Sequence, residues 1–201
     1  TVYHAAYTKE EEMTSMKKVL SCLLTLALTA ALTAPMASAA YSDVPAGSSL
    51  ASEVQKASNY GLMNGYSAGR FGYADSMTRV QFVTVVGRML GWFEGVHSTV
   101  SQITPAMQVP ASMSGTYMDA INFAVEYDVV DTDRPFRPND PITRGEMSEM
   151  LVRALGLKEA AAIAEKQNTL PFQDVTTGRG YISVAYTIGM TNGISATAFA
   201  P

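Results

Sequence analysis

The sequence predicts an all-α protein built from tandem helix–loop–helix repeats. The first observation behind this fold class is repetition. The tripeptide Val-Pro-Ala occurs at 44–46 and 109–111, and Thr-Arg occurs at 78–79 and 143–144, at the same offset. The second observation is that apolar residues after each Thr-Arg pair recur every three or four positions, which is the period of an amphipathic helix.

Composition limits the function. The 201 residues carry a formal net charge of −4 and are 47% hydrophobic. That apolar fraction is sufficient for a buried core, and the acidic balance argues against a nucleic-acid partner. His4, His97 and Cys22 are all the histidines and cysteines. They cannot form a Cys/His zinc site or a Cys–His dyad, so we expect no metal, no cofactor and no catalytic site.

The N-terminal region has the pattern of a secretory signal peptide. Two lysines at 17–18 precede an uncharged apolar run over 19–32, and Ala-Ser-Ala at 37–39 resembles a cleavage site. We assign 16–39 to a cleaved signal peptide rather than to a retained anchor, because the apolar run is short for a membrane span. The mature chain is then expected to have no membrane segment. Residues 1–15 fall outside this pattern and are interpreted as translated upstream sequence.

Three repeat units follow. They span 41–92, 107–157 and 170–201, and are joined by linkers at 93–106 and 158–169. We expect the first linker to be loop, and the second, which is alanine-rich and charged, to form a surface helix. The third unit ends before the Thr-Arg segment that the other two contain. We therefore expect it to be truncated and the chain to be a fragment.

Each complete unit is predicted to contain two helices. The first helix is expected to end at a residue that tolerates a left-handed backbone: Gly61, Asp128 and, in the third unit, Gly189. The second helix ends at Gly91 or Gly156 and carries an apolar stripe, whose methionines are interpreted as packing residues. The stripe consists of Phe82, Val85, Val86, Met89 and Leu90 in the first unit and Met147, Met150, Leu151, Ala154 and Leu155 in the second.

The Thr-Arg segments combine a helix cap with a cation that the cap does not explain. Thr78 and Thr143 each lie three residues before a Gln or Glu, the spacing of a capping box. The arginine after each threonine opposes the helix dipole, at a cost of about 0.3–1 kcal/mol. Either these arginines bind a carboxylate or phosphate ligand, or they form salt bridges with nearby aspartates. The arginines are Arg79 and Arg144, and the aspartates are Asp75 and Asp140.

The ordered motifs resemble the S-layer homology (SLH) family. The resemblance rests on Ser-Asp-Val at 42–44, Gly-x-x-x-Gly at 61–65, Phe-x-Pro at 136–138 and Ile-Thr-Arg-Gly-Glu at 142–146. These motifs occur in order, in tandem and behind a signal peptide, and the resemblance covers 41–201. It implies three modules in a pseudo-threefold arrangement, with ligand grooves between neighbouring modules.

The resemblance also implies a function, which is non-covalent anchoring of a secreted protein to the bacterial cell wall. The implied partner is a secondary cell-wall polysaccharide or another peptidoglycan-linked glycan, whose pyruvate ketals meet the arginines. The aspartates would bind hydroxyls or shape the groove, and the glycines would let the backbone approach the sugar. The implied location is the cell wall or surface layer. The ligand-binding residues that the resemblance implies are Arg79, Arg144, Asp43, Asp174, Gly65 and Gly193.

One departure and three alternatives accompany this interpretation. Gln108 replaces the module-opening aspartate in the second unit, so we expect one groove to be weakened.

Glu146 and Glu149 share a helix face as a catalytic pair would, but we interpret them as a cap residue and a surface carboxylate, and do not expect an enzyme. An enzymatic domain beyond residue 201 stays open. The segment 131–142 lacks the glycine and closing glutamate of an EF-hand. Self-assembly with copies of the same protein is the main alternative.

Overall fold

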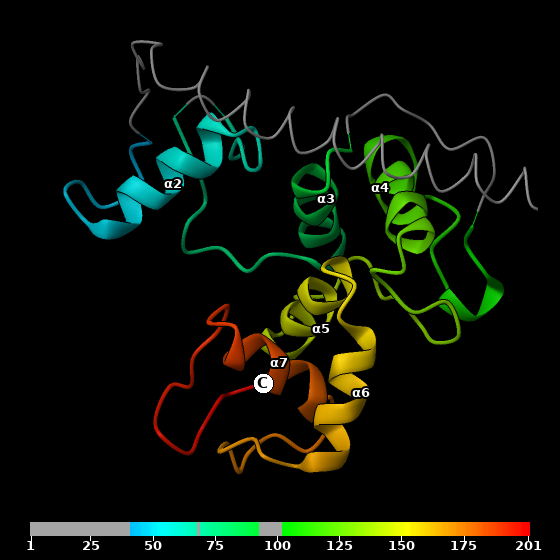
Figure 1. Cartoon of the computed structure of the whole chain (residues 1–201). Coiled ribbons are helices and arrows are strands. Elements are labelled where there is room, and N and C mark those ends of the chain that lie inside the picture. Colours follow the sequence, from blue (N-terminus) through cyan, green and yellow to red (C-terminus); the bar gives the residue numbers. More distant parts are fainter. Residues whose placement is uncertain (1–40, 68, 93–101) are drawn as a thin grey trace, which may run out of the picture. The chain divides into compact units, whose positions relative to one another are not determined.

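The computed structural model describes residues 41–67, 69–92 and 102–201, and within these ranges every regular segment longer than a β-bridge is helical. The all-α prediction is confirmed. The predicted upstream segment (1–15), the signal peptide with Cys22, and most of the first linker lie outside the described residues. The elements are α2 (Ser49–Asn59), α3 (Arg79–Met89), the 3-10 helix η1 (Pro105–Met107), α4 (Gly115–Glu126), α5 (Arg144–Ala154), α6 (Lys158–Gln167) and α7 (Arg179–Thr187) (Figure 1).

The helices begin as the sequence predicts. The Thr78 hydroxyl accepts a hydrogen bond from the Gln81 N–H (3.4 Å), and the Gln81 side chain accepts one from the Thr78 N–H (2.9 Å). The same reciprocal pair joins Thr143 and Glu146, at 3.2 Å and 3.0 Å. Both capping boxes are therefore confirmed. In the described ranges, no helix is both long and apolar enough to cross a membrane.

The helices also end as predicted. The residue after the first helix has a positive φ in all three repeats, at 67° for Gly61, 54° for Asp128 and 77° for Gly189. Gly91 and Gly156 take the same left-handed conformation after α3 and α5. In each case this conformation lets the following N–H groups reach back to carbonyls of the last turn.

The main core lies among α3, α4 and α5. It is centred on Val83, Val86, Ile121 and Met150, and includes Trp92 from the segment after α3. The predicted stripes are only partly buried, because they leave the core at their last turns. Met89 and Leu155 are each 54% exposed, whereas Val80 and Val83, which the stripe did not include, are buried.

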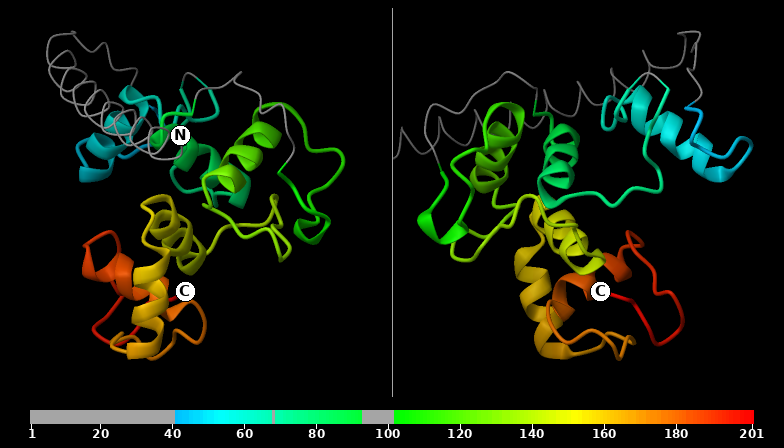
Figure 2. Two further views of the ribbon diagram at one scale, coloured as in Figure 1. Left: turned by 45° about the vertical axis from the view of Figure 1, so that its right-hand side comes forward. Right: turned by 180° about the vertical axis from the view of Figure 1, so that it is seen from behind.

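The alanine-rich linker forms a helix as predicted, but this helix is packed rather than free. α6 lies against α7 in every view (Figures 1 and 2). The approach is close at Gly180, where an added Cβ would lie 2.0 Å from the Ala161 carbonyl oxygen. The Glu165 carboxylate accepts a hydrogen bond from the Gly180 N–H and so caps α7. The helix α6 therefore shares a small core with α5 and α7, in which Val152, Ala161 and Ala185 are buried together.

Candidate functional site

We name the repeats module 1 (41–92), module 2 (107–157) and module 3 (170–201). In modules 1 and 3, the opening aspartate holds the loop of its own module. The Asp43 carboxylate accepts hydrogen bonds from the N–H groups of Phe71 (2.8 Å) and the next residue (2.6 Å). Asp174 accepts them from Phe199 (2.9 Å) and the residue after it (2.7 Å). These backbone hydrogen bonds lower the pKa of both carboxyl groups below 3.8. The two aspartates therefore shape the loop.

Module 2 anchors the equivalent phenylalanine of its loop without an aspartate. Gln108 has a φ of 50°, and the preceding carbonyl, that of Met107, accepts the hydrogen bond from the Phe136 N–H at 2.8 Å. A backbone carbonyl thus takes the place of the carboxylate. The expected weakening of a groove by Gln108 stays a prediction, but the hydrogen bond to the phenylalanine N–H is preserved.

Arg79 lies buried at the junction of modules 1 and 2, with its side chain 7% exposed. Its Nε donates to the Phe136 carbonyl at 2.5 Å, and its guanidinium lies 5.3 Å from the centroid of that ring. Its Nη1 is within ion-pair distance of Glu146, without the geometry of a directed hydrogen bond. Burial lowers the pKa of the guanidinium, and the charge of Glu146 opposes that effect. The salt bridges expected for the local aspartates are wrong, because Asp75 pairs with Arg70 and Asp140 with Arg137.

The start of α3 is occupied by the neighbouring module. The Arg79 N–H donates to the Asp140 carbonyl and the Val80 N–H to the Pro138 carbonyl, both at 3.0 Å. These module 2 carbonyls satisfy N–H groups that an anion would otherwise bind. The ligand role expected for Arg79 therefore stays a prediction, and its surroundings in the structure are those of a junction residue.

Arg144 occupies the corresponding junction between modules 2 and 3, but is more accessible. Its Nη2 donates to the Asn192 carbonyl at 2.5 Å, and its guanidinium lies 4.5 Å from the Phe199 ring centroid. Within the described part of the chain it forms no ion pair, and it is half-buried. The charge of Arg144 also helps to lower the pKa of Asp174, so that carboxylate is its nearest acidic influence. Of the two predicted arginines, Arg144 is therefore the more exposed one and the one without a direct ion pair among the described residues.

The two predicted glycines are required by their own loops. Gly65 has a φ of 67°, and a Cβ there would lie 2.6 Å from the Arg70 carbonyl oxygen. A Cβ on Gly193 would lie 2.4 Å from the Phe172 ring and 2.8 Å from the Ala198 carbonyl oxygen. Both residues therefore permit tight loop packing, whatever else they contact.

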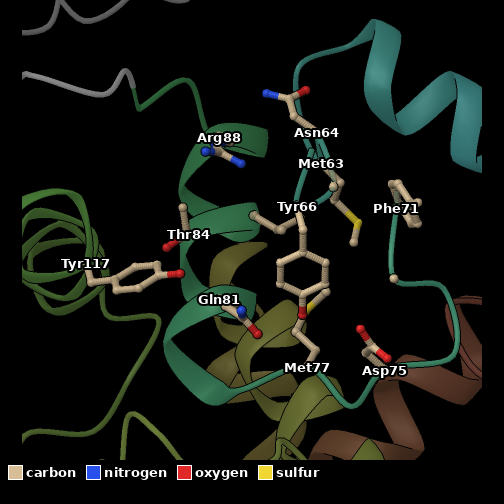
Figure 3. A pocket seen from close by; sticks show the side chains of 13 residues that line it. Met63, Asn64, Tyr66, Phe71, Asp75, Met77, Gln81, Thr84, Arg88 and Tyr117 are labelled. Atoms are coloured by element: carbon tan, nitrogen blue, oxygen red, sulfur yellow. The ribbon is translucent and has the colours of Figure 1, made fainter. Parts of the chain in front are cut away.

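A pocket of about 220 Å³ opens between the Gly65 loop of module 1 and α3, and Tyr117 from α4 of module 2 also lines it. We call it the module 1 pocket, because all its other lining residues belong to module 1. Figure 3 shows Asn64 and Tyr66 from the loop, and Gln81, Thr84 and Arg88 from the helix. Among the predicted site residues, only Gly65 lines it. The sequence did not single out the other lining residues for ligand binding, because none is conspicuous by type or spacing. The Gly-x-x-x-Gly motif at 61–65 is the signal that pointed to this loop. The pocket's polar side chains are Asn64, Tyr66, Asp75, Gln81, Thr84, Arg88 and Tyr117, and its apolar ones are Met63, Phe71, Met77 and Val85.

Comparison with known proteins assigns the family. Residues 40–83 and 109–148 match the S-layer homology domain. The chain belongs to the S-layer homology family. Within the described ranges, no group of three or more His, Cys, Asp or Glu side chains is arranged to hold a metal ion.

Three relatives agree with this assignment. The chain is 31% identical over 155 residues to the surface layer protein of Brevibacillus choshinensis, covering 75% of the chain and 14% of the relative. It is 31% identical over 157 residues to the middle cell wall protein of Brevibacillus brevis, covering 70% and 14%. It is 25% identical over 187 residues to the cell surface protein of Thermoanaerobacter kivui, covering 91% and 22%. The SLH chain thus spans less than a quarter of each relative.

Proposed function

We propose that this SLH chain anchors a secreted protein to the cell surface by binding a cell-wall glycan. Its SLH domains and the surface-layer, cell-wall and cell-surface names of its relatives support the location. In this proposal the chain itself is a binding module and not an enzyme. The proposal also names a binding site on the chain and the chemistry of the glycan.

The module 1 pocket is the observation that carries the proposal. Sugars present hydroxyl groups and flat C–H faces, which amide side chains and aromatic rings bind respectively. Asn64 and Gln81 supply amides on opposite walls, and Tyr66, 56% exposed, supplies an accessible ring. At about 220 Å³ the pocket is below the range of about 300–1,000 Å³ typical for drug-sized ligands, as suits one unit of a polymer.

Arg144 is the proposed contact for an acidic substituent such as a pyruvate ketal. A guanidinium pairs well with a carboxylate, and this one is half-exposed above the Phe199 ring. By contrast, we assign Arg79 to holding the junction, because it is buried and paired with Glu146. Anion binding at Arg144 is expected to weaken with salt.

Co-sedimentation with cell-wall sacculi tests the proposal. Full-length protein is mixed with Brevibacillus choshinensis sacculi before and after hydrofluoric acid removes their secondary polymers. Tyr66→Ala is expected to lower affinity about tenfold through the lost ring contact, whereas Tyr73→Ala, exposed but outside the pocket, leaves it unchanged. Arg144→Met is expected to remove the salt dependence. Equal binding by Tyr66→Ala and wild type would overturn the pocket assignment. Sedimentation without sacculi that grows with protein concentration would instead indicate self-assembly.

A further inference from the structure

We infer that module 2 contains the counterpart of the module 1 pocket and that its own ion pairs between Arg134, Asp131 and Glu149 keep it closed. The ligand, but not the closure, rests on the function proposed above. Module 1 then provides the open carbohydrate site of the pair. Whether each site is open or closed depends on residues that differ at equivalent positions of the two repeats.

Backbone hydrogen bonds establish the equivalence. After the first helix, the Leu62 N–H donates to the Ala57 carbonyl in module 1 (2.9 Å), and the Val129 N–H donates to the Ala124 carbonyl in module 2 (2.7 Å). The capping boxes fix the register of the second helices in the same way. The equivalent pairs that line the two sites are therefore Asn64 and Asp131, Thr84 and Glu149, and Val85 and Met150.

The space at these positions differs greatly between the modules. The pocket of about 220 Å³ in module 1 corresponds to a cavity of about 10 Å³ in module 2. Arg134 lines the small cavity, lies 2.8 Å from an Asp131 carboxylate oxygen and is also ion-paired with Glu149. The side chain of Arg153 is 2% exposed and forms a second ion pair with Asp131. The acidic and basic side chains therefore fill the site and hold one another there.

Module 1 lacks the residues for such a closure. Thr84 is shorter than Glu149 and uncharged, and Asn64 takes the place of Asp131. The module 1 loop is also longer, because the chain has five residues at 66–70 and only three at 133–135 before the equivalent phenylalanine. Together these differences leave the walls of the pocket apart.

Arg79 also borders the closed site of module 2. It lines the small module 2 cavity together with Arg134 and Glu149. Removal of the two side chains is expected to expose its guanidinium to solvent. The opened site should then prefer an acidic sugar, because a cation would face the ligand.

Cysteine accessibility tests the closure without any sugar. In full-length protein with Cys22→Ser, we compare the rates at which a neutral methanethiosulfonate reagent labels Val85→Cys and Met150→Cys, the matched positions of the two sites. Met150→Cys is expected to react about tenfold more slowly, and Arg134→Ser with Glu149→Thr should remove that difference, because thiol reactivity follows access. Arg137→Ser, which removes an arginine of the same loop outside the cavity, is the control and should not change the rate. Circular dichroism of each variant checks folding, and Glu149→Gln replaces Glu149→Thr if the latter unfolds.

Binding stoichiometry tests the ligand. The probe is a methyl hexopyranoside carrying a pyruvate ketal, with its methyl ester as the uncharged control, titrated by calorimetry. The opened variant is expected to gain one site that the ester does not fill.

Equal labelling of Met150→Cys and Val85→Cys, or no effect of the opening substitutions on labelling, would overturn the closure. Opening seen by labelling but no gain of a site would refute the carbohydrate ligand while leaving the closure supported.

Discussion

Replacement of Arg79 by alanine should destabilise the protein far more than replacement of Arg137, although both arginines pair with Glu146. Arg79→Ala removes a charged hydrogen bond to the buried Phe136 carbonyl, worth about 1.5–3 kcal/mol, and a cation–π contact worth about 0.5–2 kcal/mol. Glu146 keeps its second arginine and its role in the capping box, so the loss of the ion pair adds less than the about 3–5 kcal/mol typical of a broken buried pair.

The hydrogen bond and the cation–π contact together predict a cost of about 2–5 kcal/mol for Arg79→Ala, to which the lost ion pair adds. Arg137 is 53% exposed, and its pairs with Glu146 and Asp140 are expected to contribute about 0–1 kcal/mol, because exposed pairs are screened by solvent.

Urea unfolding measures both free energies in full-length protein. Trp92, the only tryptophan, is buried in the main core and reports unfolding by fluorescence. Equal costs for the two variants, within about 0.5 kcal/mol, would refute the reasoning about the junction. A stable Arg79→Ala protein that no longer binds sacculi would instead restore the ligand role expected for Arg79 from the sequence.

Two further predictions concern the frame of the site. Gly180→Ala should separate α6 from α7 at a cost of about 1–3 kcal/mol, because the new Cβ meets the Ala161 carbonyl; Gly145→Ala, also the second residue of its helix, meets only ordinary contacts and should cost less than about 0.5 kcal/mol in the same unfolding assay. Similar costs at the two glycines would contradict the close helix approach. Asp43→Asn should lower stability at pH 7, and the difference from wild type should shrink as the pH falls below 3.8, because the backbone hydrogen bonds lower the folded-state pKa of Asp43 from that value. The carboxylate's contribution is therefore complete above that value and is lost as the pH falls through the lowered pKa. A wild-type advantage that stays constant as the pH is lowered through the acid range would show that the contribution is not that of the ionised carboxylate.

Local features of this fold were predictable from the sequence. The capping boxes depend on two residues three positions apart, and the left-handed helix ends depend on glycine or aspartate at a single position. Such signals need no knowledge of the rest of the chain. The repeated order of the motifs then led to the family, which the comparison with known SLH domains confirms.

Partners that are distant in sequence were not predictable in the same way. The sequence suggested nearby aspartates for Arg79, but its partner is Glu146 from the next repeat. Glu149 was expected to be a surface carboxylate, yet its side chain is 16% exposed and pairs with Arg134. The two errors have different causes. The Arg79–Glu146 pair forms only when two repeats pack together. Arg134 and Glu149 belong to one repeat, and they meet only because its loop folds against α5.

The pocket was harder still to predict, because it arises where side chains are small or uncharged. Thr84 and Asn64 form no motif, and their significance appears only when they are compared with Glu149 and Asp131 in the folded structure. The pseudo-threefold arrangement stays a prediction.

Mapping the position of the bound glycan tests the central claim most directly. Cell-wall polysaccharide from Brevibacillus choshinensis, modified with a photoreactive diazirine, is irradiated with full-length protein, and the adducts are located by mass spectrometry. We predict adducts on the loop around Tyr66 and on the facing residues of α3, lost when unmodified polysaccharide competes. Competable adducts confined to other surfaces, with none on this loop or on α3, would contradict a carbohydrate site in module 1.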